Sequence, residues 1–281
     1  MIKPDFIVIG AMKCATSSVI GYLEGHPGAY LKPRCEPDFF NRDDNWAKGA
    51  DWYDRFFAEA PAGRLVGEGS NLYANRARFP ETAARMHGYC PDAKLIFMVR
   101  DPIARIQSHW IQRRADAPSE TPPTPDQAVV EDPDTYLDQS RYWHQLAPYR
   151  ERWGDDRILV GLLEDLNADP PAFQDRLCAF LGLAPYRPEA AVHANPSAAK
   201  RLQGPLFDRL RAIPGVRSLA RIAPAGAKDA VRRLTMGGTA REAPRLTPET
   251  RARLAETLCD DSAALLDWLG KPRDTWPVTA G

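Results

Sequence analysis

The chain has 281 residues, of which 44% are hydrophobic and 26% charged, a composition typical of globular proteins. Lysine plus arginine and aspartate plus glutamate both number 37, so the zero net charge gives no indication of a nucleic-acid or membrane partner. The 5 cysteines are widely spaced and include no CxxC pair, which argues against a disulfide framework and against a zinc site. Together with the lack of a signal-peptide pattern and of an apolar stretch long enough to span a bilayer, this predicts a cytoplasmic protein.

Strand and helix patterns alternate along the chain. Short apolar runs rich in β-branched residues predict strands over residues 5–9, 29–32, 65–68, 94–100 and 157–163. The spacing of apolar residues predicts helices over residues 17–24, 52–59, 80–89, 171–181 and 246–269, and Pro102 is expected to open another helix. This alternation indicates an α/β fold of three layers, with a central parallel sheet flanked by helices.

A single domain is expected over residues 1–281, because the chain shows neither an internal repeat nor a linker that separates two cores. Residues 115–140 hold seven acidic and no basic residues, and the proline-rich part at 115–135 is expected to form a mobile loop. Residues 200–245 hold eleven basic against three acidic residues, within a basic loop or helical segment at 195–245. Such segments form solvated surface or face a shared site, and charge alone does not decide between the two.

The first strand runs into a loop that carries a lysine and three hydroxyl residues, Gly10-Ala11-Met12-Lys13-Cys14-Ala15-Thr16-Ser17-Ser18. Backbone N–H groups at such a turn are unpaired and lie at the positive end of the helix dipole, so phosphate or sulfate binds there readily. The alternative is that the hydroxyls only cap the helix while Lys13 is solvated. The Walker pattern GxxxxGK[ST] is absent, because Met12 precedes the lysine and Cys14 follows it. The loop therefore predicts an anion site that differs from that of a typical ATPase.

This loop resembles the 5′-phosphosulfate loop of sulfotransferases that use 3′-phosphoadenosine 5′-phosphosulfate (PAPS), whose pattern is G-x-x-K-[CGS]-[GA]-T-[ST]-[ST]. The resemblance implies a P-loop-like fold, with PAPS as cosubstrate and 3′-phosphoadenosine 5′-phosphate (PAP) as product. It also implies that Lys13 contacts the 5′-phosphosulfate and its bridging oxygen, and so takes part in catalysis. The other cofactor-binding residues that it implies in this loop are Gly10, Cys14, Ala15, Thr16, Ser17 and Ser18.

A second segment, residues 95–110, is similar to the 3′-phosphate element of the same family, [LI]-x-x-x-[VL]-R-[DN]-P-x-x-R-x-x-S. Arg100 follows a strand and can hold a phosphate bidentately, and Ser108 on the next helix can donate to the same group. Taken alone, Arg100 also fits an ion pair and Ser108 an exposed hydroxyl. Arg105 matches the second arginine of this pattern, and it can alternatively pair with Asp101. The joint spacing of the two elements predicts a PAPS site.

Sulfuryl transfer to an alcohol requires a base that removes the proton of the attacking hydroxyl. Residues 36–40 resemble the K-E-x-x-[FY]-F motif of heparan-type and related bacterial sulfotransferases, which implies that Glu36 is the catalytic base. Residues 49–53 and 68–73 resemble the G-x-x-W-Y and E-x-[ST]-x-x-Y segments of that branch. Cys35 stands where these relatives usually have lysine, which weakens the inference of a sulfated glycan acceptor.

Alternatives to these assignments remain open. Glu36 can form a surface ion pair with Arg34, and His26 and His109 are rival bases, although a lone histidine is more often structural. The resemblance implies that Lys200 and Arg201 are cofactor contacts, and a solvated basic turn is the equal alternative. The residues expected to contact the acceptor are Phe40, Tyr73, His109 and Tyr142.

The sequence therefore predicts a sulfotransferase that moves a sulfuryl group from PAPS, in line, to a hydroxyl of a carbohydrate, a lipid or a small alcohol. No metal is expected, because cations and N–H groups supply the electrostatic stabilisation. Two alternatives are a nucleotide-dependent P-loop kinase, with Asp101 as a Mg²⁺ ligand, and a non-catalytic PAP-binding protein. Neither a nucleic-acid partner nor a membrane span is expected, and the oligomeric state is not predicted.

Overall fold

A computed structural model describes residues 3–33, 35–188, 201–203, 236–239 and 243–279. The chain divides into two compact units, each of which is considered by itself. The first unit comprises Met1–Arg105, Asp138–Ala194 and Ala255–Gly281, and the second comprises Ile106–Leu137 and Asn195–Leu254. That the two units form a single domain stays a prediction.

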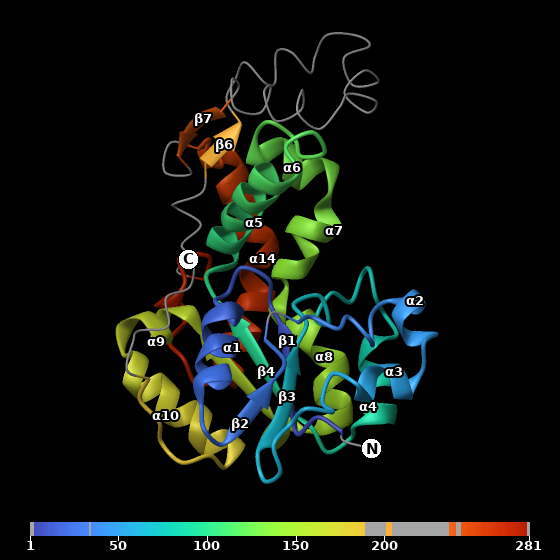
Figure 1. Cartoon of the computed structure of the whole chain (residues 1–281). Helices are drawn as coiled ribbons and strands as arrows, with labels where there is room; N and C mark the ends of the chain where they lie inside the picture. The colour runs from blue at the N-terminus through green and yellow to red at the C-terminus, as the bar shows by residue number, and fades with distance from the viewer. Residues whose placement is uncertain (1–2, 34, 189–200, 204–235, 240–242, 280–281) are drawn as a thin grey trace. The chain divides into compact units, whose positions relative to one another are not determined.

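Five parallel strands form the sheet of the first unit (Figure 1). They are β1 (Phe6–Gly10), β2 (Ala29–Leu31), β3 (Leu65–Gly69), β4 (Lys94–Val99) and β5 (Ile158–Leu162), and their order in the sheet is β2-β3-β1-β4-β5. Every residue of β1 is buried, as expected for a central strand that is covered on both faces. All five predicted strands are confirmed, each end lying within one residue of its expected place.

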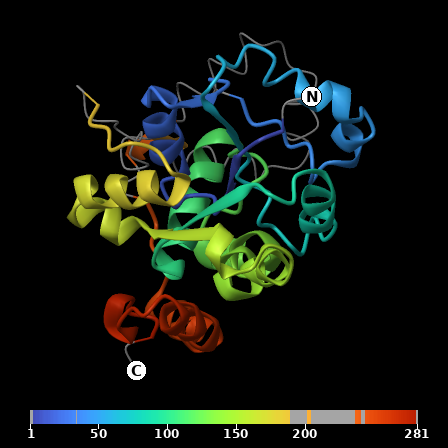
Figure 2. The ribbon, with the colours of Figure 1, turned by 90° about the horizontal axis from the view of Figure 1, so that it is seen from below.

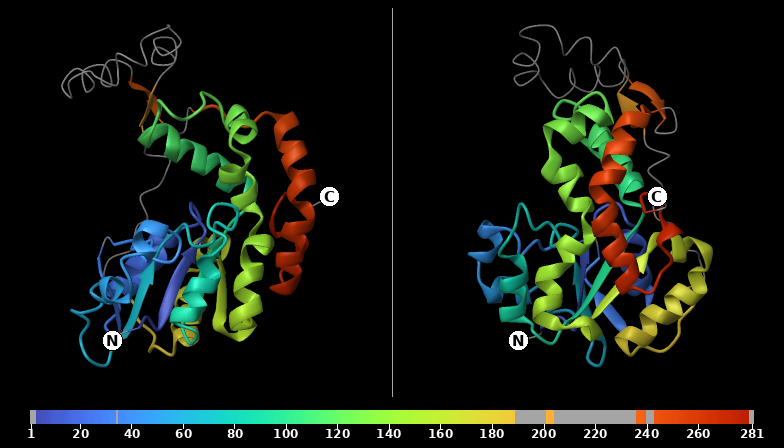
Figure 3. Two further views of the ribbon diagram at one scale, coloured as in Figure 1. Left: turned by 90° about the vertical axis from the view of Figure 1, so that its right-hand side faces the viewer. Right: turned by 180° about the vertical axis from the view of Figure 1, so that it is seen from behind.

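Helices cover both faces of this sheet. One face carries α1 (Thr16–Gly25) and α10 (Pro170–Leu181), and the other carries α4 (Thr82–Tyr89) and α8 (Tyr142–Trp153) (Figures 1 and 2). The view from behind in Figure 3 shows α4 and α8 side by side. This arrangement confirms the predicted three-layer α/β fold.

The other elements of the first unit are short. They are α2 (Asp43–Trp46), α3 (Ala50–Asp54), α9 (Leu163–Ala168) and 3₁₀ helices at Asp138–Ser140, Asp155–Arg157 and Arg273–Thr275. Two longer helices, α5 (Pro102–Asp116) and α14 (Pro248–Trp268), have residues in both units. None of the helices in the described ranges combines the length and the apolar character that crossing a membrane requires.

Helix α8 is not predicted by the sequence patterns, because its interior holds Pro148, which lacks an N–H donor and normally ends a helix. Packing outweighs this penalty. Tyr142, Leu146, Tyr149 and Trp153 recur every three or four residues and are all buried, so they form one continuous apolar face. The burial of this face stabilises the helix despite the proline.

The second unit contains α6 (Pro125–Glu131), α7 (Pro133–Tyr136) and an antiparallel pair, β6 (Arg201–Gln203) and β7 (Met236–Thr239). The segment expected as a loop at 115–135 thus includes helices. The Thr124 hydroxyl accepts from the Gln127 N–H at 3.3 Å, and proline follows directly at the first helical position. Asp132 and Pro133 repeat this cap-and-proline pattern, a signal from which both helices were predictable. Most of the basic segment lies outside the described residues.

Gly67 in β3 is expected not to tolerate a side chain. A Cβ atom there would lie 2.2 Å from two ring carbons of the buried Phe6, so Gly67→Ala is expected to lower the free energy of unfolding by about 1–3 kcal/mol through overpacking. The matched control is Gly88→Ala in α4, where the added methyl meets nothing within 4 Å. Higher helix propensity is expected to raise its stability by up to about 1 kcal/mol. Urea unfolding measures both variants, and equal stabilities would contradict this packing.

Candidate functional site

Residues that follow four neighbouring strands meet at one edge of the sheet. Gly10 ends β1, Glu36 follows β2, Asn71 follows β3 and Arg100 follows β4. The carboxyl ends of parallel strands are where open α/β sheets bind ligands. Asn71 lies against both Gly10 and Glu36, and Arg100 contacts the loop that follows Gly10.

The backbone between β1 and α1 has the shape of an anion cradle. Lys13 and Ala15 have left-handed φ angles of 73° and 66°, a conformation that turns successive N–H groups toward one side. Ala15 is the N-cap of α1 and makes no side-chain cap hydrogen bond; the Ser18 N–H donates to the Ala15 carbonyl at 3.0 Å, which leaves the N–H groups of Thr16 and Ser17 for a ligand or water. Gly10 has a φ of 132°, and a Cβ there would lie 3.1 Å from the Asn71 carbonyl oxygen. Glycine at this position therefore allows the close approach of the β3 loop.

The side chains of the loop differ in exposure. Thr16 is buried, Ser18 is half-buried and Ser17 is exposed. Cys14 is fully buried, with its Sγ 3.5 Å from the Tyr142 hydroxyl oxygen. Burial raises the pKa of the Cys14 thiol to about 11, although the Tyr142 hydrogen bond acts in the opposite direction. Cys14 thus stays a neutral, buried thiol, and its backbone N–H donates to the Ala11 carbonyl at 3.2 Å.

Arg100 lies against this loop. Its Nη1 donates to the Lys13 carbonyl at 3.4 Å, and its Nε is buried without a hydrogen-bond partner in the described part of the chain. A buried cationic N–H without an acceptor is unfavourable, so an anion at this position would satisfy it. Ser108 is buried on α5 in the second unit, and its expected partnership with Arg100 stays a prediction.

Asp101 and Arg105 have structural partners. Asp101 caps the start of α5, because its carboxylate accepts from the Ala104 N–H at 2.5 Å and its own N–H donates to Glu164 at 2.9 Å. The Arg105 side chain is fully buried, and its Nε donates to the Ser140 hydroxyl at 2.8 Å. These contacts account for the two residues without a ligand.

Asn71 holds the Glu36 carboxylate. The Asn71 side-chain amide donates to Glu36 Oε1 at 2.9 Å, and its backbone N–H donates to Oε2 at 3.3 Å. Partial desolvation raises the pKa of Glu36 above its ordinary value, while the two hydrogen bonds from Asn71 lower it. A carboxylate with a raised pKa beside an anion cradle is suited to accept a proton. Arg34, its predicted alternative partner, lies outside the described residues.

Beneath this loop lies a buried carboxylate to which the sequence patterns assign no role. Glu68, at 4% exposure, accepts from the hydroxyls of Tyr53, Tyr73 and Ser70 at 2.9, 2.7 and 3.1 Å. The segment at residues 68–73 matches a family motif, but the order of residues in the chain does not show that three hydroxyl groups converge on Glu68. Burial raises the pKa of Glu68 to about 7.

Glu68 is expected to make stability depend on pH. Its folded pKa of about 7 exceeds the ordinary 4.5, so its contribution is present below pH 4.5 and lost as pH rises through 7. At 1.36 kcal/mol per pKa unit, the loss is on the order of 3 kcal/mol. Urea unfolding is expected to show that the wild type is less stable at pH 8 than at pH 5, and that Glu68→Gln does not lose stability in this way. The same pH dependence in both proteins would contradict this role of Glu68.

The residues expected to contact the acceptor are buried. Phe40 and Tyr142 are 0% exposed and Tyr73 is 1% exposed, so these side chains pack beneath the surface. His109 is also buried, in the second unit, with its ring 5.3 Å from that of Tyr136. Contact of these four residues with an acceptor stays a prediction. The burial of Phe40, Tyr142 and Tyr73 favours a supporting role for these three.

The remaining candidates from the sequence are His26, Lys200 and Arg201. His26 is buried, its Nδ1 accepts from the Gly28 N–H at 3.0 Å and its Nε2 lies 2.9 Å from the Ala184 carbonyl. Both ring nitrogens are thus used in structural contacts. Lys200 lies outside the described residues, and Arg201 begins β6 in the second unit.

Parts of the chain are similar in sequence to known sulfotransferases. A family model described as "Sulfotransferase family" matches residues 79–188, which include Arg100 and Ser108. Over 126 residues the chain is 34% identical to membrane-associated sulfotransferase kil1 of Dictyostelium discoideum, covering 42% of this chain and 26% of that protein. Over 186 residues it is 28% identical to heparan sulfate glucosamine 3-O-sulfotransferase 3B1 of Mus musculus, covering 64% of this chain and 46% of that protein. The chain spans less than half the length of these two relatives.

A solved structure shows the same fold over almost the whole chain. The sulfotransferase from Alicyclobacillus acidocaldarius superposes with a TM-score of 0.68 at 23% identity, covering 97% of this chain and 98% of that one. This likeness concerns the fold, and the matched sequence segments show similarity to sulfotransferases over part of the chain. The family model and both relatives thus show that the chain is similar to sulfotransferases in sequence, and the solved structure shows the same similarity in fold.

Proposed function

We propose that this chain transfers a sulfuryl group from PAPS to a hydroxyl group of an acceptor and releases PAP. The observation that carries the proposal is the position of Asn71, which binds the Glu36 carboxylate and closely approaches the Gly10 backbone. A carboxylate therefore lies next to the strand-to-helix loop, which supports Glu36 as the proton acceptor beside a bound phosphosulfate. This is the combination that transfer to an alcohol requires.

In the proposed reaction, Glu36 takes the hydroxyl proton as the acceptor oxygen attacks sulfur. The new S–O bond forms opposite the bond between sulfur and the bridging oxygen of the 5′-phosphate, which breaks in line. The electron pair of the broken bond stays on PAP. Lys13 and the N–H groups of the loop stabilise the charge that develops there. Glu36 then passes its proton to water.

The two ends of PAPS are assigned to two groups of residues. Arg100, whose Nε is buried and has no hydrogen-bond partner among the described residues, is proposed to bind the 3′-phosphate, with Ser108, Lys200 and Arg201 as further candidates. Lys13 and the loop are proposed to bind the 5′-phosphosulfate. In that loop Gly10, Cys14 and Ala15 act through their backbone, and Thr16, Ser17 and Ser18 add hydroxyls. We propose no metal, because these cations and N–H groups supply the required electrostatics.

The acceptor is proposed to be a hydroxyl of a carbohydrate, a lipid or a small alcohol. The mouse relative is named for heparan sulfate glucosamine, which makes a carbohydrate the first acceptor to test. Because Cys35 replaces the lysine that is usual in these relatives, a lipid and a small alcohol remain acceptors to test as well.

Radiolabelled PAPS tests this function with three probes: heparan sulfate, dodecanol and p-nitrophenol. We expect label to pass to at least one of them, with PAP formed in equal amount. Phosphate transfer from MgATP without PAPS would favour the kinase, although Asp101 already serves as a helix cap. PAP binding without transfer to any probe would favour the non-catalytic protein.

We also propose the cytoplasm as the compartment, because the five cysteines are free thiols. One relative is named as membrane-associated, so cell fractionation is the appropriate test. Recovery of the protein with the membrane fraction would overturn this part of the proposal.

A further inference from the structure

The loop that carries Glu36 is fastened from below through two hydroxyl groups. The Tyr73 hydroxyl oxygen accepts from the Phe39 N–H at 3.1 Å, and the Ser70 hydroxyl oxygen accepts from the Asp38 N–H at 3.1 Å. Both hydroxyls donate their hydrogens to Glu68, to Oε1 and Oε2 respectively. Two backbone amides, two and three residues after the candidate base, thus connect to one buried carboxylate.

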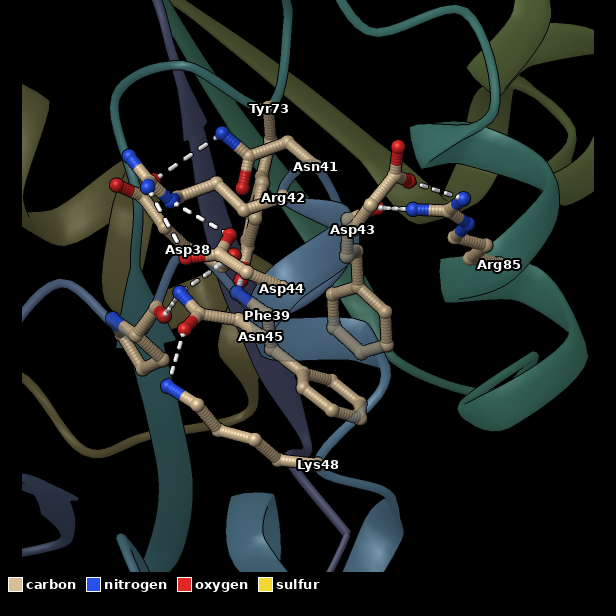
Figure 4. A network of polar contacts seen from close by, with 12 residues as sticks. Asp38, Phe39, Asn41, Arg42, Asp43, Asp44, Asn45, Lys48, Tyr73 and Arg85 are labelled. Atoms are coloured by element: carbon tan, nitrogen blue, oxygen red, sulfur yellow. Dashed lines mark hydrogen bonds and ion pairs between the residues drawn. The ribbon is translucent and has the colours of Figure 1, made fainter.

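The same loop is held on its other side by Asn45. Its side-chain amide donates to the carbonyls of Pro37 and Asp38 at 3.0 and 3.3 Å (Figure 4). Asp38 has a left-handed φ of 48°, which is unfavourable for a residue with a side chain. The loop therefore needs these contacts to keep its shape, and Figure 4 shows Tyr73 reaching into it.

The protonation state of Glu68 decides the direction of these hydrogen bonds. A hydroxyl has one hydrogen, and when an ionised carboxylate accepts it, the oxygen lone pairs are left for the amides. A protonated Glu68 carries a hydrogen of its own and competes for a hydroxyl oxygen. The hydroxyl that receives this hydrogen loses the acceptor for its own, so its oxygen is no longer held in place, and where that hydroxyl is Tyr73 or Ser70 its contact with the loop amide is weakened.

We propose that Glu68 is a positioning residue for Glu36, which it acts on through Tyr73 and Ser70 and the backbone of Asp38 and Phe39. The role rests on the proposed function, because it matters for catalysis only if Glu36 is the base. The network itself is a property of the loop and can be measured without PAPS or an acceptor.

The groups that face Glu68 support a switch near neutral pH. Burial raises the pKa of Glu68 to about 7 and holds the pKa values of Tyr53 and Tyr73 well above their ordinary value, so both tyrosines stay donors. We therefore expect a fastened loop above pH 7 and a loosened loop below it. The titratable and charged groups that face Glu68 are Cys35, Asp38, Tyr53, Tyr73 and Cys90, and Lys32 lines the same small cavity.

Two tyrosine variants form a matched test. Tyr53 and Tyr73 are both buried and both donate to Glu68 Oε1, but only Tyr73 accepts from the loop backbone. The Tyr53 ring stacks on Phe39 at 4.5 Å, and Tyr53→Phe keeps that ring. Tyr53→Phe and Tyr73→Phe thus each remove one hydrogen bond to Glu68. If Glu68 had only a structural role, Tyr53→Phe and Tyr73→Phe would have the same effect on the loop.

Amide hydrogen exchange at pH 8 reads the loop directly. We expect Tyr73→Phe to speed exchange at the Phe39 amide by about tenfold, with less than about twofold change in Tyr53→Phe. The amide of Ile96 in β4 reports global opening in the same samples. Equal rates at Phe39 in the two variants, after that correction, would overturn the proposal.

Two further readouts connect the loop to Glu36 and to pH. By carbon-13 NMR, we expect the pKa of Glu36 to fall toward its ordinary value in Tyr73→Phe and to stay unchanged in Tyr53→Phe. Protection of the Phe39 amide in the wild type should be lost as pH falls through 7, and Glu68→Gln should remove this dependence. An unchanged Glu36 pKa in Tyr73→Phe, or a pH dependence kept in Glu68→Gln, would overturn the positioning role. Failure of sulfuryl transfer by the wild type would overturn the proposed function and leave these exchange results intact.

Discussion

Glu36→Gln is expected to lower kcat by about 10²–10⁴-fold while the affinity for PAP stays the same. Glutamine keeps the length and shape of the side chain but cannot take a proton. Its carbonyl can still accept from Asn71, which donates to both carboxylate oxygens of Glu36 in the wild type. The proposed PAP-binding loop at residues 10–18 is not altered by this change. Initial rates with radiolabelled PAPS and calorimetry with PAP measure the two quantities separately.

The control for this variant is Asp44→Asn. Asp44 is an exposed carboxylate on the neighbouring helix α2, where it pairs with Arg42 at 3.1 Å. Loss of its charge is expected to change neither rate nor affinity, because an exposed ion pair contributes little. If Glu36→Gln retains the wild-type rate, another group removes the proton. If both variants lose activity to the same extent, the loss reports general damage to this segment.

Arg100→Ala is expected to weaken PAP binding by about 10- to 100-fold, because hydrogen bonds to charged groups contribute about 1.5–3 kcal/mol. The variant removes both the unpartnered Nε and the Nη1 contact to the Lys13 carbonyl. Arg100→Lys should bind with intermediate affinity, since lysine keeps the charge but loses the planar fork. Calorimetry with PAP measures all three proteins.

Arg157 is the matched arginine for this test. It directly precedes β5 at the opposite, amino-terminal end of the sheet strands, where its Nη1 donates to the Asp92 carbonyl at 2.6 Å. Arg157→Ala removes the same charge at the other end of the strands, away from the loop at residues 10–18. We therefore expect its affinity for PAP to be unchanged. Equal weakening by Arg100→Ala and Arg157→Ala would mean that net charge, and no particular phosphate contact, governs binding.

The parts of the fold that local patterns encode were predictable from sequence. The run that ends at Gly10 and the run before Arg100 are both continuous apolar stretches, and both are central strands of the sheet. Helix α8 was missed because Pro148 signals a break, while the burial of Tyr142 and Leu146 decides the outcome. Packing between distant segments outweighed the local signal there.

Side-chain direction was the less predictable part of the site. Phe40 and Tyr73 belong to recognisable motifs, but a motif does not tell whether a side chain faces the surface or the core, and both are buried. The role of Glu68 depends on hydroxyls from α3 and from the segment after β3, which only the folded chain brings together. Asn71 likewise became a candidate only when the structure placed it between Glu36 and Gly10.

Calorimetric titration of the wild-type chain with PAP, with MgATP as the comparison ligand, tests the central claim most directly. The account predicts that one PAP binds per chain without added metal, and that MgATP binds at least about 100-fold more weakly, as the loss of two charge-assisted contacts would give. Absence of PAP binding, or binding of MgATP with equal affinity, would contradict it.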